Sequence, residues 1–208
     1  MKRMNRTCVK TNEGGPEESM QTDTEIIQRI SQGDVEAYRE IIQRYQRMIF
    51  VFIYKMVNNA ADAEDLTQEV FVKAYEKLSS YRGDSQFSTW LHTLARNRTI
   101  DFLRRRKIHE SDEQLAYIPS QARDGSPQES LLGKERRQEI ARAFEQLSDT
   151  YREVIILRCT HEYPFERIAS LLGIAESTAR VRYLRARQEL AKILTRSEGG
   201  LVHELPGV

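Results

Sequence analysis

The amino-acid sequence predicts an all-α protein in which two helical domains are joined by a flexible linker. Apolar residues recur at spacings of three and four through residues 22–107 and again through residues 134–196. Between them, residues 108–133 contain Pro119, Gly125 and Pro127 and lose that periodicity. Residues 1–21 and 197–208 are predicted to be a disordered N-terminal tail and a C-terminal tail.

The charge balance limits the function classes. The chain has 208 residues, with 32 Lys and Arg against 31 Asp and Glu, so its net charge is only +1. A nucleic-acid partner would therefore have to be bound by local basic clusters. No run approaches the 18 apolar residues of a membrane span, and the polar start lacks the apolar centre of a signal peptide. We expect a cytoplasmic protein without membrane insertion.

The cysteines and histidines show no metal-binding pattern. Cys8 and Cys159 form no CxxC pair, and the four histidines have no ligand spacing among them. The histidines are His92, His109, His161 and His203. We therefore expect no disulfide, no metal site and no cofactor.

The first predicted domain begins with two amphipathic helices. Thr22 and Glu25 form a capping box, Gly33 is expected to end the first helix, and Asp34 is expected to cap the second. The second helix keeps helical spacing from Ala37 to Met56 and should stop at the pair of asparagines 58–59. It is the expected backbone of the first core.

The next helix, residues 62–78, is expected to present an acidic outer face. Its apolar side should hold Leu66, Val70, Phe71, Ala74 and Leu78, and its outer side Asp62, Asp65, Gln68, Glu69 and Lys73. Three interpretations are open: a solvated face, a docking surface for a basic partner helix, or the metal site of a nuclease. A nuclease site is the least favoured, because Asp65 and Glu69 have no neighbouring histidine and no second acidic motif.

A turn-forming loop, residues 79–88, precedes a helix with an aromatic side and a basic end. Phe87, Trp90, Leu91, Leu94, Ala95 and Phe102 fall within one arc. Six basic residues and one acidic residue lie between positions 87 and 107. This combination indicates nucleic-acid binding, although a core helix with a solvated basic end has the same pattern.

The last third has the layout of a helix-turn-helix. Pro164 suits the first position of a helix, Ala169 is small where two helices cross, Gly173 suits the turn, and Glu176 opens the second helix. Between Arg180 and residue 196 there are again six basic residues and one acidic residue. A three-helix bundle without a DNA role remains the alternative.

Three segments in order resemble one family, the extracytoplasmic-function (ECF) group of the sigma-70 factors of bacterial RNA polymerase. They are DAEDLTQEVFVKAY at 62–75, FSTWLHTLARNRTIDFLRRR at 87–106 and IASLLGIAESTARVRYLRARQEL at 168–190. The resemblance covers residues 24–194. It implies sigma region 2 at residues 22–107 and sigma region 4 at residues 134–196.

The resemblance also implies partners and site residues. The expected partners are promoter DNA, an anti-sigma factor, and core RNA polymerase through the clamp coiled coil of its largest subunit; no catalysis is expected. The polymerase-binding residues would be Asp62, Asp65, Gln68, Glu69 and Lys73. The residues at the −10 element would be Tyr81, Arg82, Gly83, Asp84, Ser85, Phe87, Trp90, Arg96, Asn97, Arg104 and Arg105. Those at the −35 element would be Ser177, Thr178, Arg180, Val181, Arg182, Leu184 and Arg185.

Within the loop and helix at the −10 element, we expect mainly the loop to contact an extruded base, with Phe87 and Trp90 as a rigid floor behind it. The alternative is that both aromatic residues belong to the core and the loop is only a connector, and core packing is the favoured role of Trp90. The chain departs from the family pattern at Ala179 and Tyr183 in the core and at Val181 on the DNA side. The competing interpretation is a stand-alone helix-turn-helix regulator, which would need a dimer interface, and no dimerisation helix is evident.

Overall fold

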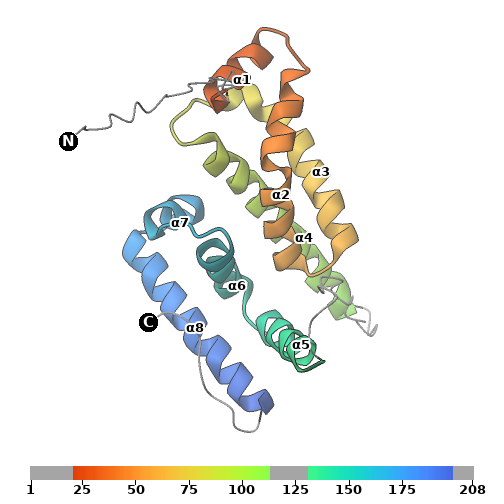
Figure 1. The fold of residues 1–208 in the computed structure, drawn as a ribbon, viewed down its shortest axis with the longest axis vertical. Coiled ribbons are helices and arrows are strands. Elements are labelled where there is room, and N and C mark those ends of the chain that lie inside the picture. The colour runs from red at the N-terminus through yellow and green to blue at the C-terminus, as the bar shows by residue number, and fades with distance from the viewer. Residues whose placement is uncertain (1–20, 113–130, 199–208) are drawn as a thin grey trace, which may run out of the picture.

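The structure is a computed structural model that describes residues 21–112 and 131–198. These residues form helices and no strand, which confirms the predicted all-α class. The first bundle contains α1 (Asp23–Ser31), α2 (Ala37–Val57), α3 (Ala60–Lys77) and α4 (Phe87–Asp112). The second contains α5 (Leu131–Glu145), α6 (Asp149–Ile155), α7 (Phe165–Leu172) and α8 (Glu176–Glu198) (Figure 1). A 3₁₀ turn, Leu78–Ser80, follows α3, and a π-helical segment, Ile156–Thr160, follows α6.

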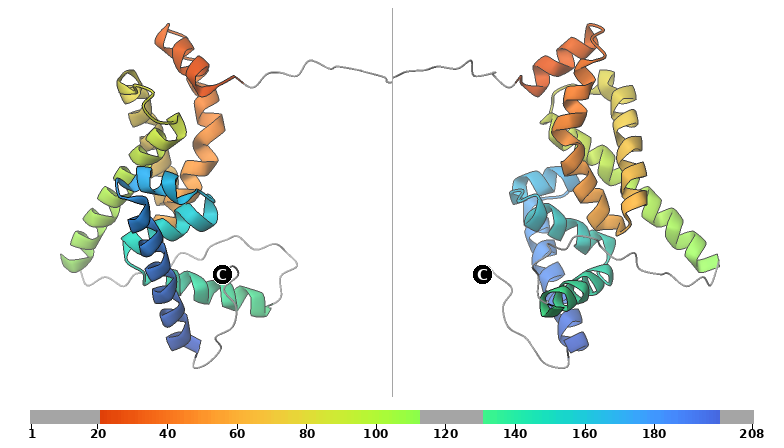
Figure 2. Two further views of the ribbon diagram at one scale, coloured as in Figure 1. Left: turned by 90° about the vertical axis from the view of Figure 1, so that its left-hand side faces the viewer. Right: turned by 45° about the vertical axis from the view of Figure 1, so that its right-hand side comes forward.

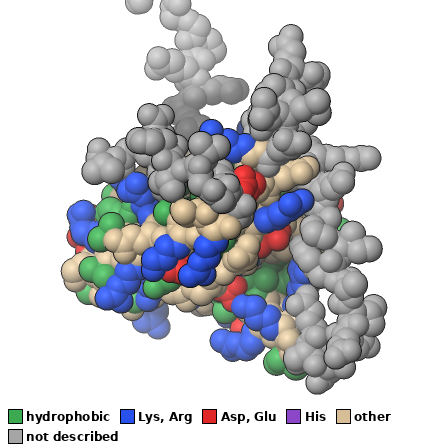
Figure 3. Space-filling view, turned by 90° about the horizontal axis from the view of Figure 1, so that it is seen from below, with side chains coloured by type: hydrophobic (Ala, Val, Ile, Leu, Met, Phe, Trp, Pro, Cys, Tyr) green, Lys and Arg blue, Asp and Glu red, His purple; other side chains and the backbone are tan. Residues whose placement is uncertain are grey.

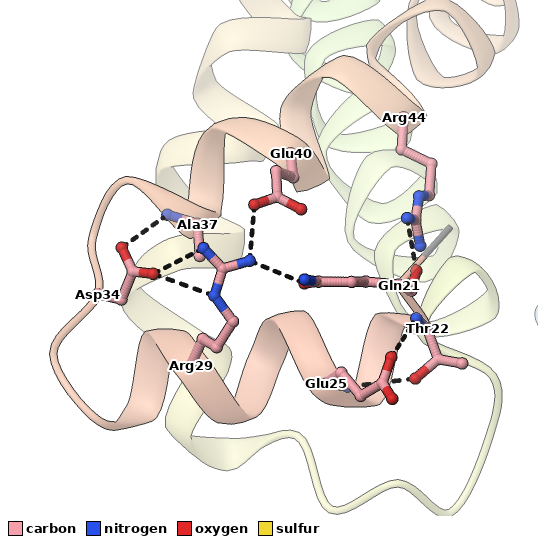
Figure 4. Close-up of polar contacts among 8 residues, drawn as sticks. All are labelled: Gln21, Thr22, Glu25, Arg29, Asp34, Ala37, Glu40 and Arg44. Carbon is pink, nitrogen blue, oxygen red and sulfur yellow. Dashed lines mark hydrogen bonds and ion pairs between the residues drawn. The ribbon is translucent and has the colours of Figure 1, made fainter. Parts of the chain in front are cut away.

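The turn between α1 and α2 is held by polar contacts (Figure 4). The predicted capping box is present: the backbone N–H of Thr22 donates to Glu25 at 2.7 Å, and that of Glu25 donates to the Thr22 hydroxyl at 3.3 Å. Arg29 crosses the turn and pairs with Asp34 at 2.7 Å and Glu40 at 2.8 Å. The Arg29 guanidinium lowers the pKa of Asp34, so this carboxylate keeps the charge with which it pairs to Arg29.

The start of α2 differs slightly from the prediction. Asp34 does not cap the helix itself, because an extra turn intervenes before Ala37; its carboxylate accepts the Ala37 N–H at 3.2 Å. Gly33 has a φ of 101°, a left-handed value that suits glycine. Gly33 therefore allows the backbone to reverse, and the ion pairs of Arg29 with Asp34 and Glu40 hold the turn in place.

The two asparagines between α2 and α3 have separate roles. Asn58 ends α2 in the left-handed region with a φ of 54°, and Asn59 caps α3 by accepting the N–H of Asp62 at 3.2 Å. This cap starts α3 at residue 60, two residues before the predicted start. The predicted apolar side of α3 is buried against α2 and α4.

The buried apolar residues form one connected core, to which each bundle contributes a part. The first bundle contributes mainly Ile41, Ile49, Phe52, Ile53, Met56, Leu66, Val70 and Leu91. The second contributes Val154, Ile156, Leu157, Ile168, Leu171, Ala179 and Ala186. Gly173, with a φ of 63°, makes the turn between α7 and α8. The small Ala179 and Ala186 allow α8 to lie close to the helices it covers.

Three helix ends lie inside the segments predicted as linker and C-terminal tail. Helices extend into both ends of the predicted linker, 108–133: α4 continues to Asp112 and α5 begins at Leu131. Residues 108–112 contain neither glycine nor proline, so nothing in them stops the helix. Similarly, α8 runs to Glu198, two residues into the predicted C-terminal tail. The rest of the predicted linker and tails lies outside the described residues.

The two bundles pack directly on each other, which the sequence did not indicate. Helix α7 lies against α4, and α6 lies against α2 (Figures 1 and 2). The Tyr163 hydroxyl of the second bundle reaches the Met48 sulfur of the first at 3.1 Å. Arg152 donates to the Met56 carbonyl oxygen, at the end of α2, at 2.8 Å. We call this arrangement the closed arrangement.

Candidate nucleic-acid and polymerase interface

The loop between α3 and α4 is closed by a side chain of its own. The Tyr81 hydroxyl donates to the Ser85 carbonyl oxygen at 2.6 Å, across a turn in which Gly83 has a φ of 80°. Burial raises the pKa of Tyr81, with smaller contributions from Asp23 and Asp84, so the hydroxyl keeps its proton and can act as the donor. The exposed residues between Tyr81 and Phe87 are Arg82, Gly83, Asp84, Ser85 and Gln86.

A hollow of about 850 Å³ lies between this loop and α1. Its lining includes Asp23, Thr24, Ile27, Gln28, Tyr45, Tyr81, Arg82, Gly83, Ser85, Phe87 and Ser88. The lining combines aromatic rings with hydroxyl, amide and charged groups. A hollow with these groups can hold a flat polar ring, such as a nucleobase, by stacking and by hydrogen bonds.

The aromatic residues behind the loop support one another. The ring of Phe87 lies 5.4 Å from that of Tyr81, 5.4 Å from that of Trp90 and 5.7 Å from that of Tyr45. Phe87 is only 2% exposed, whereas Tyr81 and Trp90 are half-buried. Phe87 is thus a supporting core residue, and Tyr81 offers more surface to a ligand.

A support beneath the loop was missed by the sequence reasoning. Asp23, in the first turn of α1, accepts from Arg44 at 2.5 Å and from the Tyr45 hydroxyl at 2.5 Å. Burial, followed by the Asp23 bond, raises the pKa of Tyr45. These contacts tie α1 to α2 at one side of the hollow, so the first helix is part of the site.

The basic residues of α4 divide into two groups. Arg104 and Arg105 are exposed, as is the neutral Asn97. Arg96 instead lies between the bundles and binds Glu153 of α6 at 2.5 Å, although it was predicted to face promoter DNA. Lys107 also reaches the second bundle, at 2.6 Å from Asp149. The space-filling view of the lower end of the molecule shows Lys and Arg side chains prominent on that face (Figure 3).

Glu153 is the least solvated carboxylate among the described residues. It is 1% exposed, and burial raises its pKa, while the positive charges of Arg96 and Arg182 act in the opposite direction. Arg182 is half-buried on this side of α8 rather than on its outer face. The carboxylate is therefore stabilised in its charged form mainly by a residue from the other bundle.

Further contacts between the bundles involve α7. Arg167 donates to the Ser88 hydroxyl at 2.8 Å, next to the loop before α4. The rings of His92 and His161 lie 5.1 Å apart across the interface. Burial lowers the pKa of His92 to about 3 and that of His161 to about 4. Within the described residues, neither ring nitrogen of His92 has a hydrogen-bond partner.

The acidic side of α3 combines charged and apolar groups. Asp65, Gln68, Glu69 and Lys73 are exposed, and Asp62 is half-buried. Glu69 pairs with Arg98 of α4 and Lys73 with Glu76, whereas Asp65 makes no ion pair with a described residue. Val72, 61% exposed, and Tyr75 stand on the same helix and were missed. The charged residues line a hollow of about 570 Å³.

The helix-turn-helix is present as predicted. Helix α7 ends at Gly173, and α8 begins at Glu176 with Ser177 and Thr178 exposed in its first turn. Arg185 is exposed, as are Val181 and Leu184. Arg180 makes contacts within its own domain: its guanidinium lies 2.5 Å from the Glu176 carboxylate and 4.8 Å from the centre of the Phe165 ring.

No group of three or more metal-ligating side chains occurs in residues 21–112 and 131–198. In the same ranges, no helix is both long enough and apolar enough to cross a bilayer. Cys159 is a free, exposed cysteine whose sulfur lies 3.5 Å from the Tyr183 hydroxyl.

Comparison with known proteins decides the family. The family models described as Sigma-70 region 2 and Sigma-70, region 4 match residues 41–108 and 137–190. The ECF RNA polymerase sigma factor SigW of Bacillus subtilis is 32% identical over 176 residues, covering 81% of this chain and 94% of the relative. The chain belongs to the ECF sigma factors.

Further comparisons agree. The ECF RNA polymerase sigma-E factor of Escherichia coli K12 is 32% identical over 177 residues, covering 81% of this chain and 92% of the relative. Among solved structures, the sigma factor RpoE of Bartonella quintana, crystallised with the anti-sigma factor NepR, is similar with a TM-score of 0.64 and 28% identity. That alignment covers 77% of this chain and 98% of RpoE.

The family assignment gives each surface a place in the sigma factor. Region 2 comprises most of the first bundle, with α3, the loop and α4, and region 4 contains the helix-turn-helix. Helix α1 and the first turn of α2 lie outside the matched part of region 2, yet α1 carries Asp23, which lines the hollow. In this sigma factor, the closed arrangement covers Arg96 of region 2 and leaves the outer face of α8 exposed.

Proposed function

We propose that this sigma factor binds core RNA polymerase through α3 and directs promoter-specific initiation. The loop 81–86 and α4 would act at the −10 element, and α8 at the −35 element. The observation that supports this best is the pairing of two different DNA-binding devices in one chain: an aromatic hollow suited to an unstacked base, and a helix-turn-helix suited to a duplex groove. A stand-alone regulator would not need the first device.

Promoter binding requires the two bundles to separate. The −10 and −35 elements are about 25 base pairs apart, which is about 85 Å along B-form DNA. In the closed arrangement, α7 of the helix-turn-helix touches Ser88 beside the loop. The two DNA-binding devices are then too close together to occupy both elements. We propose that the closed arrangement belongs to the free sigma factor and opens on polymerase.

The chain would supply recognition, with catalysis left to core polymerase, and it would act in the cytoplasm. We also propose that an anti-sigma factor controls it, because the similar RpoE structure was solved with such a partner. The decisive test mixes the purified protein with core RNA polymerase and a promoter library. Specific run-off transcription is the expected result, and its absence with active core enzyme would refute the function.

We expect the charge reversal Asp65→Lys to weaken binding to core polymerase by about tenfold. Asp65 is exposed and makes no ion pair with a described residue, so its charge is available to a basic partner, and a like charge there opposes association. Glu69 should matter less, because Arg98 already pairs with it. Titration of core polymerase with labelled protein measures the affinity. Glu36→Lys, an exposed reversal outside α3, is the matched control and should leave binding unchanged.

We expect Tyr81→Phe to slow promoter opening several-fold without unfolding region 2. The substitution removes the hydroxyl that closes the loop onto Ser85 and keeps the ring against Phe87, at a cost of about 1 kcal/mol in loop order. Permanganate reactivity of thymines near −10 measures the opening. Tyr151→Phe, in the second bundle, is the control; normal opening in Tyr81→Phe would show that the loop need not be fixed by this bond.

A further inference from the structure

The outer face of α8 presents an apolar centre where it would meet DNA. Ser177, Val181, Leu184 and Gln188 follow one another at helical spacing and share this face. The opposite face holds the buried Ala179 and Ala186, so the orientation of the helix is fixed. Val181 is 47% exposed and Leu184 is 55% exposed. Helix α8 lies at the outer edge of the second bundle, away from α2 and α3 (Figure 1).

The basic residues flank this centre and do not occupy it. Arg180 lies on one flank, with its guanidinium held by Glu176 and stacked on Phe165. Arg185 lies on the other flank and is exposed. Reading a guanine in the major groove requires an arginine that points its two nitrogens at the base edge. The Arg180 side chain is 60% exposed beside the apolar centre and pairs with Glu176, so its charge lies on the flank, where contacts to phosphate are made.

Position 181 therefore offers the DNA two methyl groups and no hydrogen-bonding group. In the major groove, the apolar feature of a base pair is the C5 methyl of thymine, and apolar side chains contact it. Burying one methyl group changes an affinity by about fourfold. A cytosine at the same place presents an amino group, which an aliphatic side chain would desolvate without a bond.

We infer that Val181 is a specificity-determining residue that contacts a thymine methyl group in the −35 element, with Leu184 extending the apolar contact to the neighbouring position. The inference rests on the proposed role of α8 at the −35 element. It identifies what this helix reads: an A·T pair recognised by its methyl group, between phosphates held by the flanking basic residues. Ser177, one turn before Val181, is the nearest exposed hydroxyl on this face.

The experiment removes single methyl groups from the DNA. Holoenzyme made from the full chain and core polymerase first selects its −35 sequence from a randomised duplex. Each thymine of the selected sequence is then replaced by deoxyuridine, which lacks only the C5 methyl, and affinities are measured. With the natural chain, at least one replacement should weaken binding by about fourfold. With Val181→Ala, binding to the thymine duplex should fall by several-fold, and the same replacement should have less than a twofold effect.

Two controls separate the possible failures. Val181→Thr keeps one side-chain methyl and should retain part of the sensitivity to deoxyuridine, whereas Arg185→Ala should weaken all duplexes equally and leave that sensitivity intact. If the natural holoenzyme selects no sequence, the proposed −35 role fails. If it selects one and Arg185→Ala weakens binding, but Val181→Ala leaves the deoxyuridine effects unchanged, only the inference about Val181 is overturned.

One further outcome would show that the outer face of α8 contacts a protein and not DNA. If Val181→Ala weakens the complex with core polymerase in the absence of DNA, and the deoxyuridine effects stay as in the natural chain, the apolar centre is a protein contact and the inference is wrong. Because Val181 is exposed, Val181→Ala should leave the helical circular dichroism spectrum and the folding of region 4 unchanged.

Discussion

Replacing Arg96 with glutamine should release region 4 from region 2 in the free protein. The substitution leaves the Glu153 carboxylate in a site that is 1% exposed, without the guanidinium that binds it at 2.5 Å. Removing one partner of a buried ion pair typically costs about 3–5 kcal/mol. That cost is avoided when the bundles separate and water reaches Glu153. We therefore expect the ratio of open to closed protein to rise by more than a hundredfold.

The shift can be measured as a fall in energy transfer between dyes on α3 and α8. Cysteines introduced at Lys77 and Lys192 would carry the dyes, with Cys8 and Cys159 replaced by serine. Arg98→Gln is the matched control, because Arg98 lies on the same helix and its partner, Glu69, is exposed. That change should cost less than about 1 kcal/mol. Equal energy transfer in the two variants would show that the Arg96 pair does not hold the closed arrangement.

The double substitution Arg96→Gln with Glu153→Gln gives a second check. It removes both charges and leaves two amide groups that can hydrogen-bond, so the closed arrangement should largely return. In Arg96→Gln alone, protonation of Glu153 as the pH falls should favour closure, and it opposes the opening that protonation of His92 and His161 favours over the same range. The reason is that burial raises the pKa of Glu153, and a group with a raised pKa favours the buried state when it is protonated.

In the natural protein, by contrast, acidification should favour the open arrangement. The pKa of His92 is lowered to about 3 and that of His161 to about 4 in the closed arrangement, chiefly by burial and further by Arg167 and Lys55. Their usual pKa is about 6.5. Both histidines are therefore neutral in the closed state above pH 6.5, and closure weakens as the pH falls from 6.5 towards 4. Each contributes up to about 1.4 kcal/mol per pH unit over that window.

At pH 5.5 the two histidines together should disfavour closure by up to about 3 kcal/mol relative to neutral pH. The same pair of dyes, followed from pH 8 to pH 5, would report the opening. His161→Phe keeps an aromatic ring beside Phe52 and Tyr163 but cannot titrate, so it should roughly halve the slope. A slope unchanged by this substitution would exclude the histidine pair as the origin of the pH dependence.

Local signals in the sequence predicted most of the helices. The capping box at Thr22, the asparagines that end α2, and the glycine turn of the helix-turn-helix depend on neighbouring residues, and each is present. The held position of Arg180 could also have been predicted, since Glu176 precedes it by four residues on a helix. Its stacking on Phe165, however, depends on how α7 meets α8.

The contacts between the bundles could not be predicted in this way. Arg96 and Glu153 are separated by 57 residues, and each lies in a helix whose local pattern fits an exposed charge as well as a paired one. Helical periodicity places a residue on a side of its own helix but does not say which other element covers that side. The same limit applies to Phe87, whose burial depends on Tyr45 and Tyr81 from two other elements.

Helix α4 also limits how far the two promoter-binding devices can reach. It is 26 residues long, so it is a rod of about 39 Å with the loop at its first end and the link to region 4 at the other. Eighteen residues lie between Asp112 and Leu131, and a chain of that number spans at most about 65 Å, which is less than the roughly 85 Å between the promoter elements. The rod must therefore contribute to the span. Promoter spacing would then be set partly by the direction in which α4 points once the loop has engaged, and a change in its length would move region 4 by about 1.5 Å per residue.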